Sequence, residues 1–252
     1  MPARVYAVAN QKGGVGKTTT AVNLAACLAE PGERALLVDL DPQANATSGL
    51  GLRANGTSAH DLLDGVPLER LAKPSPFPNL DVVPARSDLA GAAVELSLRA
   101  GGERYLAEML QGGALAPYSF VFLDCPPAFG PLTVNALAAA DRVVVPVQAE
   151  YYALEGLSQL LGSINLVKAR LNPGLAVAGI LLTMVDARTR LAADVEAELR
   201  RHFGPLVFAT AVPRSVRLAE APSHGLPAIA YDRRSSGAQA YWKVAMELVD
   251  RR

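Results

Sequence analysis

The chain alternates short, continuously apolar runs with longer stretches in which apolar residues recur at helical spacing. The runs are rich in β-branched residues and predict strands at Val5–Ala9, Ala35–Asp39, Leu80–Val83, Phe120–Leu123, Val143–Val147 and Val177–Leu182. The longer stretches predict helices over Lys17–Ala29, Ser87–Leu98, Leu154–Leu171, Leu191–Phe203 and Ser235–Arg252. Strands without polar alternation are typical of a parallel sheet that helices cover on both faces.

This alternation predicts an α/β fold with a doubly wound, mostly parallel sheet and helices on both faces. Such sheets bind their ligands at the carboxyl ends of the strands. The length of 252 residues suits a single domain over residues 1–252. The stretch Arg53–Pro78 is the least regular part and is expected to form loop or short helix.

Composition narrows the functional classes. Half of the residues are hydrophobic and 19% are charged, which excludes a disordered chain. Twenty-four basic residues balance twenty-four acidic ones, so a uniformly basic nucleic-acid binder is excluded and only a local basic patch remains open. No signal peptide or membrane-length apolar run is present, so we expect a soluble, cytoplasmic protein without a membrane partner.

The metal-binding residue types are few. Cys27 and Cys125 are the only cysteines, which excludes a disulfide framework and a four-cysteine zinc site. His60, His202 and His224 lack the spacing of metal ligands along the chain.

A glycine-rich loop carries the strongest chemical signal. It spans residues 10–20, follows the first predicted strand and runs directly into a helix. Glycines let backbone N–H groups turn toward phosphate oxygens, and the helix N-terminus adds partial positive charge. Lys17 is expected to reach the β- and γ-phosphates, and the Thr18 hydroxyl to reach Mg²⁺. The candidate cofactor-binding residues in the loop are Gln11, Lys12, Gly13, Gly14, Val15, Gly16, Lys17, Thr18 and Thr19.

The loop departs from the usual phosphate-loop consensus at two positions. Gln11 stands where that consensus has its first glycine, and Lys12 adds a second lysine to the loop. Two lysines on one short loop repel each other unless a polyanion neutralises both. This strand–loop–helix context makes the P-loop NTPase type the expected variant of the fold.

Carboxylates follow two other predicted strands. Asp39 and Asp41 lie in the Asp-Pro-Gln loop, residues 39–44, and Asp124 begins the Asp-Cys-Pro-Pro loop, residues 124–127. Carboxylates at strand ends beside a phosphate loop are placed to hold Mg²⁺ and an attacking water. Thr18, Asp39 and Asp124 are therefore the candidate metal residues.

The string from Ala9 to Thr20, together with Asp39-Leu40-Asp41-Pro42-Gln43, resembles the ParA/Soj-type partition ATPases. These belong to the deviant Walker A group, which also includes MinD and the nitrogenase iron protein. Segments 145–156 and 213–225 also look like Soj segments, so the resemblance covers nearly the whole chain. Ala44 replaces a more usual glycine, and Ser215 stands where asparagine is common.

The resemblance implies a slow ATPase that uses ATP and Mg²⁺ and sandwiches two ATP molecules in a homodimer. Lys12 would cross to the ATP of the partner subunit, and Asp41 would orient the attacking water. With Lys17 these are the candidate catalytic residues. The adenine pocket would involve the strand end at Met184 and the turn Pro213, Arg214 and Ser215.

DNA is the second expected ligand. Residues 186–252 carry 11 basic and 8 acidic residues, whereas residues 1–185 carry 13 and 16. On charge alone this excess favours a solvated face, but the resemblance implies that the region about 186–234 is the DNA-facing surface, with Arg188, Arg214 and Arg217 as its candidate residues. By resemblance, the ATP dimer binds DNA without sequence preference, associates with the nucleoid and segregates chromosomes or plasmids with a ParB-like centromere-binding partner.

Three alternatives stay open at this point. One is a MinD-like ATPase that cycles on membranes, and another is an iron–sulfur electron carrier using Cys27 and Cys125. The third uses the same ATP and DNA chemistry to position a protein cargo, such as a chemoreceptor array.

Overall fold

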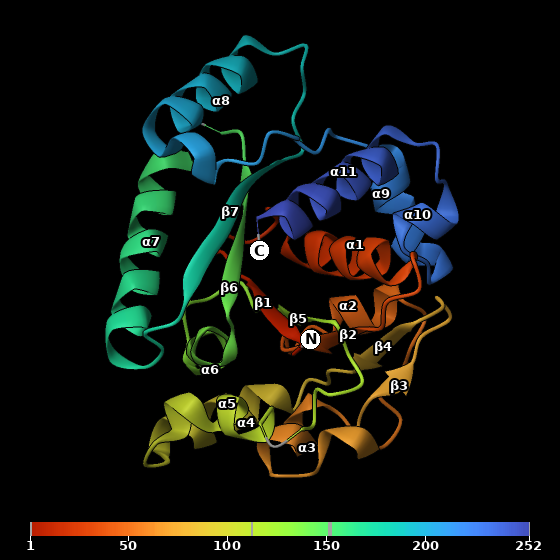
Figure 1. Ribbon diagram of the computed structural model, residues 1–252, viewed down its shortest axis with the longest axis vertical. Helices are drawn as coiled ribbons and strands as arrows, with labels where there is room; N and C mark the ends of the chain where they lie inside the picture. Colours follow the sequence, from red (N-terminus) through yellow and green to blue (C-terminus); the bar gives the residue numbers. More distant parts are fainter. Residues whose placement is uncertain (1, 112, 151–152, 252) are drawn as a thin grey trace.

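The computed structural model describes residues 2–111, 113–150 and 153–251, so Tyr151 and Tyr152 of the 145–156 segment lie outside it. Its described strands form one seven-stranded sheet in the order β3-β4-β2-β5-β1-β6-β7 (Figure 1). They are β1 (Arg4–Val8), β2 (Ala35–Asp39), β3 (Lys73–Pro74), β4 (Leu80–Val83), β5 (Phe120–Asp124), β6 (Arg142–Gln148) and β7 (Ala176–Thr183). All neighbours pair in parallel except β3, which is antiparallel to β4. The predicted α/β fold is confirmed.

Successive side chains of the central strands enter opposite hydrophobic layers. In β5, Phe120 and Phe122 belong to one cluster, and Val121 and Leu123 to the other. Because both faces are apolar, each must be covered, and this double burial explains the continuously apolar runs in the sequence.

The layer that contains Phe120 and Phe122 packs on α1 (Lys17–Ala29) and α11 (Ser236–Asp250). These two helices lie side by side in Figure 1. The short helices of this side are α2 (Asn45–Gly49), α9 (Val216–Glu220) and α10 (Ala228–Tyr231). Tyr241, Val244, Ala245 and Leu248 of α11 are buried, so this helix closes the core on this side.

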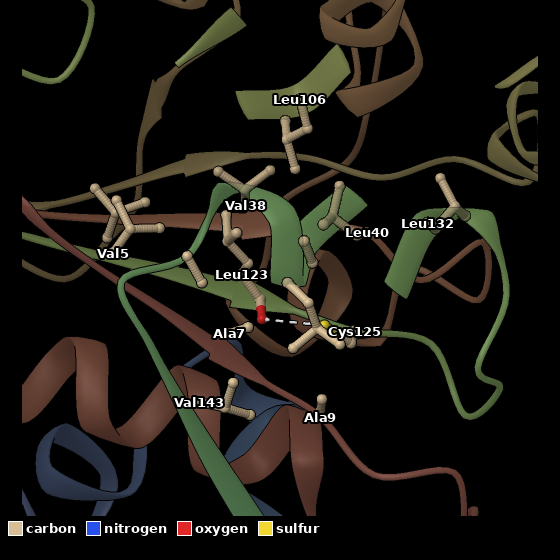
Figure 2. Packing of buried hydrophobic residues seen from close by; sticks show 14 of the residues in the cluster. Val5, Ala7, Ala9, Val38, Leu40, Leu106, Leu123, Cys125, Leu132 and Val143 are labelled. Carbon is tan, nitrogen blue, oxygen red and sulfur yellow. Dashed lines mark hydrogen bonds between the residues drawn. The ribbon is translucent and has the colours of Figure 1, made fainter. Parts of the chain in front are cut away.

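The opposite layer holds α3 (Ala59–Leu63), α4 (Leu89–Leu98), α5 (Tyr105–Met109), α6 (Pro131–Ala139), α7 (Ala153–Arg170) and α8 (Arg190–Phe203). Figure 2 shows part of its core, which includes Val5, Val38, Leu123 and Cys125. Short 3₁₀ turns occur at Leu68–Arg70, Gly102–Arg104, Gly204–Leu206 and Ala221–His224.

The predicted strands and the long predicted helices are confirmed, with ends displaced by only a few residues. The irregular stretch 53–78 contains α3, a 3₁₀ turn and β3. The helices that were not predicted are α2, α5, α6, α9 and α10. Helix α11 ends at Asp250, and Arg252 lies outside the described residues.

The strand register places the chemistry at one edge of the sheet. Asp124 pairs with Val8 of β1 on one side and with Asp39 of β2 on the other. The phosphate loop, which follows β1, therefore starts beside the two carboxylates, Asp39 and Asp124, at the ends of the neighbouring strands. Among the helices of the described residues, none is long and apolar enough to cross a membrane.

Candidate nucleotide-binding site

The loop between β1 and α1 has the backbone shape that phosphate binding requires. Gly14 and Gly16 have φ of 74° and 83°, in the left-handed region that favours glycine. The Thr183 hydroxyl at the end of β7 donates a 2.8 Å hydrogen bond to the Val15 carbonyl. This bond ties the middle of the loop to the end of β7.

Lys17 is the first residue of α1 and is buried. Its Nζ donates to the Lys12 carbonyl at 3.0 Å, which holds the ammonium against the loop. Burial lowers the pKa of Lys17, while the negative charges of Asp124 and Asp41 act in the opposite direction. A cation in so dry a position is strongly stabilised by an anionic ligand.

A cavity of about 610 Å³ opens above this loop. Eight of the predicted site residues line it: Gly13, Gly14, Gly16, Lys17, Thr18, Thr19, Asp41 and Met184. The other lining residues are Gln43, Asn45, Ser48, Gly49, Pro127, Pro222 and Ser223. None of these seven was predicted as a site residue, although Gln43, Pro127, Pro222 and Ser223 lie inside loops or segments noted above.

Asp124 is the carboxylate without a partner. It is fully buried, and neither of its oxygens has a hydrogen-bond partner among the described residues. Burial and the neighbouring Asp39 raise the pKa of Asp124 well above its ordinary value, while Thr18 and Lys17 act to lower it. A buried carboxylate with unused lone pairs beside a threonine hydroxyl fits a divalent cation.

Asp39 has a different environment. Its Oδ1 accepts from the Asp41 N–H at 3.1 Å, and its Oδ2 accepts from the Thr47 N–H at 2.9 Å and the Thr47 hydroxyl at 2.7 Å. Burial nevertheless raises the pKa of Asp39 to about 6. The geometry thus makes Asp39 a brace for the Asp-Pro-Gln loop, since both oxygens already accept hydrogen bonds.

Asp41 reaches the cavity from the same loop. Its Oδ1 accepts from the Gln43 N–H at 2.9 Å, which fixes the carboxylate at the cavity wall. The two carboxylates therefore have different roles: Asp39 accepts hydrogen bonds within the loop, and Asp41 lines the cavity.

Lys12 lies outside the cavity. Its side chain is 53% exposed and forms an ion pair with Glu150, which follows β6. The Lys12 N–H donates to Asn10 Oδ1 at 3.0 Å, and Gln11 Nε2 lies 3.5 Å from the Ser163 hydroxyl of α7. The Lys12 side chain thus pairs with Glu150 and does not line the cavity, and Glu150 is a partner that the sequence did not indicate.

A second cavity, of about 220 Å³, adjoins the first. All four residues expected at the adenine line it: Met184, Pro213, Arg214 and Ser215. Tyr241 of α11 closes one side. Met184 has φ of 52°, a conformation that side-chain-bearing residues rarely adopt and that is often found at binding sites.

The candidate DNA-binding arginines are exposed, but two of them are already paired. Arg188 is 87% exposed and makes a two-pronged contact with Asp186, at 2.9 and 2.7 Å. Arg217 pairs with Glu220 at 2.8 Å and with Asp232 at 3.4 Å. These contacts hold the pKa of Asp186 and of Glu220 below their usual range. Arg214 has no ion pair among the described residues.

The two cysteines are buried in opposite layers, Cys27 on α1 and Cys125 after β5. The Cys125 thiol donates to the Leu123 carbonyl at 3.7 Å, as drawn in Figure 2. Burial raises the pKa of Cys27 to about 12. A cluster shared between subunits needs accessible thiolates, so this arrangement does not suit the iron–sulfur alternative.

Known proteins resemble the chain over nearly its whole length. A family model described as an AAA domain matches residues 3–177. The sporulation initiation inhibitor protein Soj of Bacillus subtilis is 51% identical, over 97% of this chain and 98% of that protein. The chromosome-partitioning ATPase Soj of Thermus thermophilus is 56% identical, over 98% and 96%.

Among solved structures, cobyrinic acid a,c-diamide synthase from Mycobacterium smegmatis, with bound ATP analogue and magnesium, is 38% identical. It superimposes with a TM-score of 0.83 over 97% of this chain and 93% of that one. The identity to the curated relatives and their matching lengths show that the chain belongs to the Soj/ParA family of chromosome-partitioning ATPases.

Proposed function

We propose that this protein is a Mg²⁺-dependent ATPase that works as a dimerising switch: in its ATP state it binds DNA non-specifically and helps to segregate a chromosome or plasmid. The observation that carries the proposal is the buried Lys17, which lines one cavity with Asp41 and feels the charge of the unpartnered Asp124. Relatives named as chromosome-partitioning proteins support the cellular role.

The two cavities suit a nucleoside triphosphate. They share Gly16, Thr19 and Met184, so one ligand can extend from the larger into the smaller. The larger cavity offers loop N–H groups and the Lys17 ammonium to a polyanionic tail. The smaller one offers Met184, Pro213 and the Tyr241 ring to a flat base. The solved structure with a bound ATP analogue and magnesium is consistent with this assignment.

Thr18 and Asp124 would hold Mg²⁺, with Asp39 bracing the adjacent loop. When bound, the ion neutralises charge that develops on the phosphates. Asp41 would orient the attacking water, because its carboxylate lines the cavity and is fixed by Gln43. Lys17 and the loop would hold the phosphates in place.

Lys12 would act in a partner subunit. Its ion pair with Glu150 joins two half-exposed side chains, and such surface pairs stabilise by only about 0–1 kcal/mol. The pair therefore holds Lys12 loosely in the monomer and releases it at little cost. A cation brought to the transferring phosphoryl group by a second chain contributes roughly 10³–10⁵ in rate in comparable enzymes.

The DNA-binding surface would combine Arg188, Arg214 and Arg217 of both subunits. One such patch is small and partly neutralised by Asp186 and Glu220, so a monomer should bind weakly. Joining two patches in a dimer raises avidity without a new contact. ATP-dependent dimerisation would thereby control association with the nucleoid.

A ParB-like partner would stimulate hydrolysis and release the dimer from DNA. Positioning of a protein cargo uses the same ATP and DNA chemistry, and the relatives named for chromosome partitioning favour the segregation role.

The test is binding to a non-specific DNA duplex with ATP, with ADP and without nucleotide, each at two salt concentrations. We expect binding only with ATP, and a steep fall with salt because phosphate contacts release counterions. Binding that is absent in every state while ATP hydrolysis is intact would contradict the DNA role and favour the membrane-cycling alternative.

Two variants separate the parts of the proposal. Lys12→Ala should lose ATP-dependent dimerisation and hydrolysis. Arg188→Glu combined with Arg217→Glu should abolish DNA binding and keep basal hydrolysis. Equal loss of DNA binding and ATP hydrolysis in the double variant would contradict the assignment of these arginines to the DNA-binding surface.

A further inference from the structure

A histidine and two carboxylates meet on the sheet face opposite α1. His60 and Asp64 lie four residues apart on α3, and Glu95 reaches them from α4. One potential ligand atom of each residue lies within 4.8 Å of the other two, and His60 Nδ1 is 3.5 Å from Asp64 Oδ2. None of the three lines either nucleotide cavity.

The backbone beneath these side chains is firmly held. The buried Ser58 caps α3 and accepts a hydrogen bond from the His60 N–H at 3.2 Å, and Asp61 completes the capping box. Leu62 and Leu63 of α3 enter the same core cluster as Leu89, Ala92 and Leu96 of α4. Two elements that pack on one core thus present the three groups at fixed positions.

The usual neutralising cations are missing from this group. Among the described residues, Asp64 forms an ion pair only with His60, and Glu95 forms none. Arg99, four residues after Glu95, stacks on the Tyr105 ring instead, with its guanidinium carbon 3.9 Å from the ring centre. Arg86 pairs with Asp88. Within the described part of the chain, the two carboxylates therefore converge on an imidazole and form no ion pair with a lysine or arginine.

We propose that His60, Asp64 and Glu95 bind a divalent transition-metal ion of the zinc class. Imidazole nitrogen with carboxylate oxygens is a donor set that Zn²⁺ accepts, whereas Mg²⁺ prefers oxygen ligands alone. Three protein ligands leave a coordination position for water. The ion would link α3 to α4, independently of the nucleotide site.

The spacing of the three histidines could not indicate this group, because two of its ligands are carboxylates and one comes from another helix. Only the packing of α3 against α4 brings them together.

The experiment is calorimetric titration of chelator-treated, full-length protein with Zn²⁺, in buffer that contains Mg²⁺ and ADP. We expect one site, and at least a tenfold loss of affinity in His60→Ala and in Glu95→Gln. Saturating Zn²⁺ should raise the melting temperature of the wild type but not of His60→Ala, because a ligand that binds the folded state stabilises it.

His202 provides a matched control. It forms the same kind of i,i+4 pair with Glu198, at 3.3 Å, but no third ligand is grouped with it among the described residues. His202→Ala should leave the zinc site intact. No binding by the wild type, undiminished affinity in both His60→Ala and Glu95→Gln, or equal loss in His202→Ala would each overturn the proposal. Circular dichroism checks that the variants fold, and Mg²⁺-dependent ATP hydrolysis, which should be unchanged in Glu95→Gln, separates this result from the proposed function.

Discussion

Ala44 lies in the loop between β2 and α2 with φ of 54°, a backbone conformation that L-residues with a side chain rarely adopt. It is also the position where the sequence departs from its family by replacing glycine. The left-handed conformation costs an alanine about 1–2 kcal/mol, whereas glycine adopts it freely. The departure noticed in the sequence therefore coincides with local strain in the loop that carries Asp41.

We predict that Ala44→Gly stabilises the protein by about 0.5–1 kcal/mol, because the relief of strain exceeds the entropy that glycine loses on folding. Chemical denaturation measures the change. Ala197→Gly, in the exposed middle of α8, is the control and should instead cost about 1 kcal/mol. Destabilisation by both changes would show that Ala44 is not strained.

At the residue scale, sequence reasoning located the carboxylates but could not assign their partners. Asp39 and Asp124 both follow buried strands, and their spacing along the chain gives no reason to treat them differently. The structure separates them because Thr47 supplies two donors to Asp39, whereas no described residue donates to Asp124. Such differences arise from side chains that only the fold brings together.

At the scale of secondary-structure elements, a buried pair of hydroxyls links helices α1 and α11. The Thr20 hydroxyl lies 3.0 Å from the Tyr241 hydroxyl, and both residues are almost completely buried. Burial raises the pKa of Tyr241, so the phenol stays protonated as a hydrogen-bonding group at neutral pH. The pair fixes the phosphate-loop helix against the helix that closes the smaller cavity.

We predict that Tyr241→Phe lowers the free energy of unfolding by about 1–2 kcal/mol, because it leaves the Thr20 hydroxyl buried without this partner. Combining it with Thr20→Val should cost less than the sum of the two single changes, since both polar groups are then removed. Denaturant unfolding of the four proteins gives the coupling. Strict additivity would mean that the hydroxyls do not interact.

The elements that the sequence predicted are those with strong local signals. The continuous apolar runs and the capped or amphipathic helices were found, whereas α2, α9 and α10 are only four or five residues long and depend on tertiary contacts. Helix α6 was missed because it follows a loop with two prolines and a glycine, Pro126, Pro127 and Gly130, and itself starts with Pro131. The residues that α2 and the turn at Pro222 add to the larger cavity were missed because short elements of this kind depend on tertiary contacts.

On the scale of the whole molecule, acidic residues moderate the proposed DNA surface. Asp186 contacts Arg188 directly, and the positive charge of Arg214 helps to lower its pKa. An exposed ion pair of this kind is weak, so a DNA phosphate can compete for the arginine. The acidic partner should therefore reduce DNA affinity without preventing binding.

We predict that Asp186→Asn raises the affinity of the ATP state for non-specific duplex about two- to fivefold at low salt, because it frees Arg188 for a phosphate. Fluorescence anisotropy with a labelled duplex measures it. Asp194→Asn removes the same charge beside Arg190, 3.9 Å away, which is outside the candidate set, and should have a smaller effect. Equal gains from both changes would indicate net charge rather than this particular pair.

The contact between α1 and α11 also has a consequence for synthesis of the protein. Residues 10–20 leave the ribosome early, but Tyr241, which closes the smaller cavity, is added more than two hundred residues later. A nascent chain therefore carries a complete phosphate loop long before it has a complete pocket for the base. The pocket for the base is therefore complete only after α11 has been made and has packed against α1.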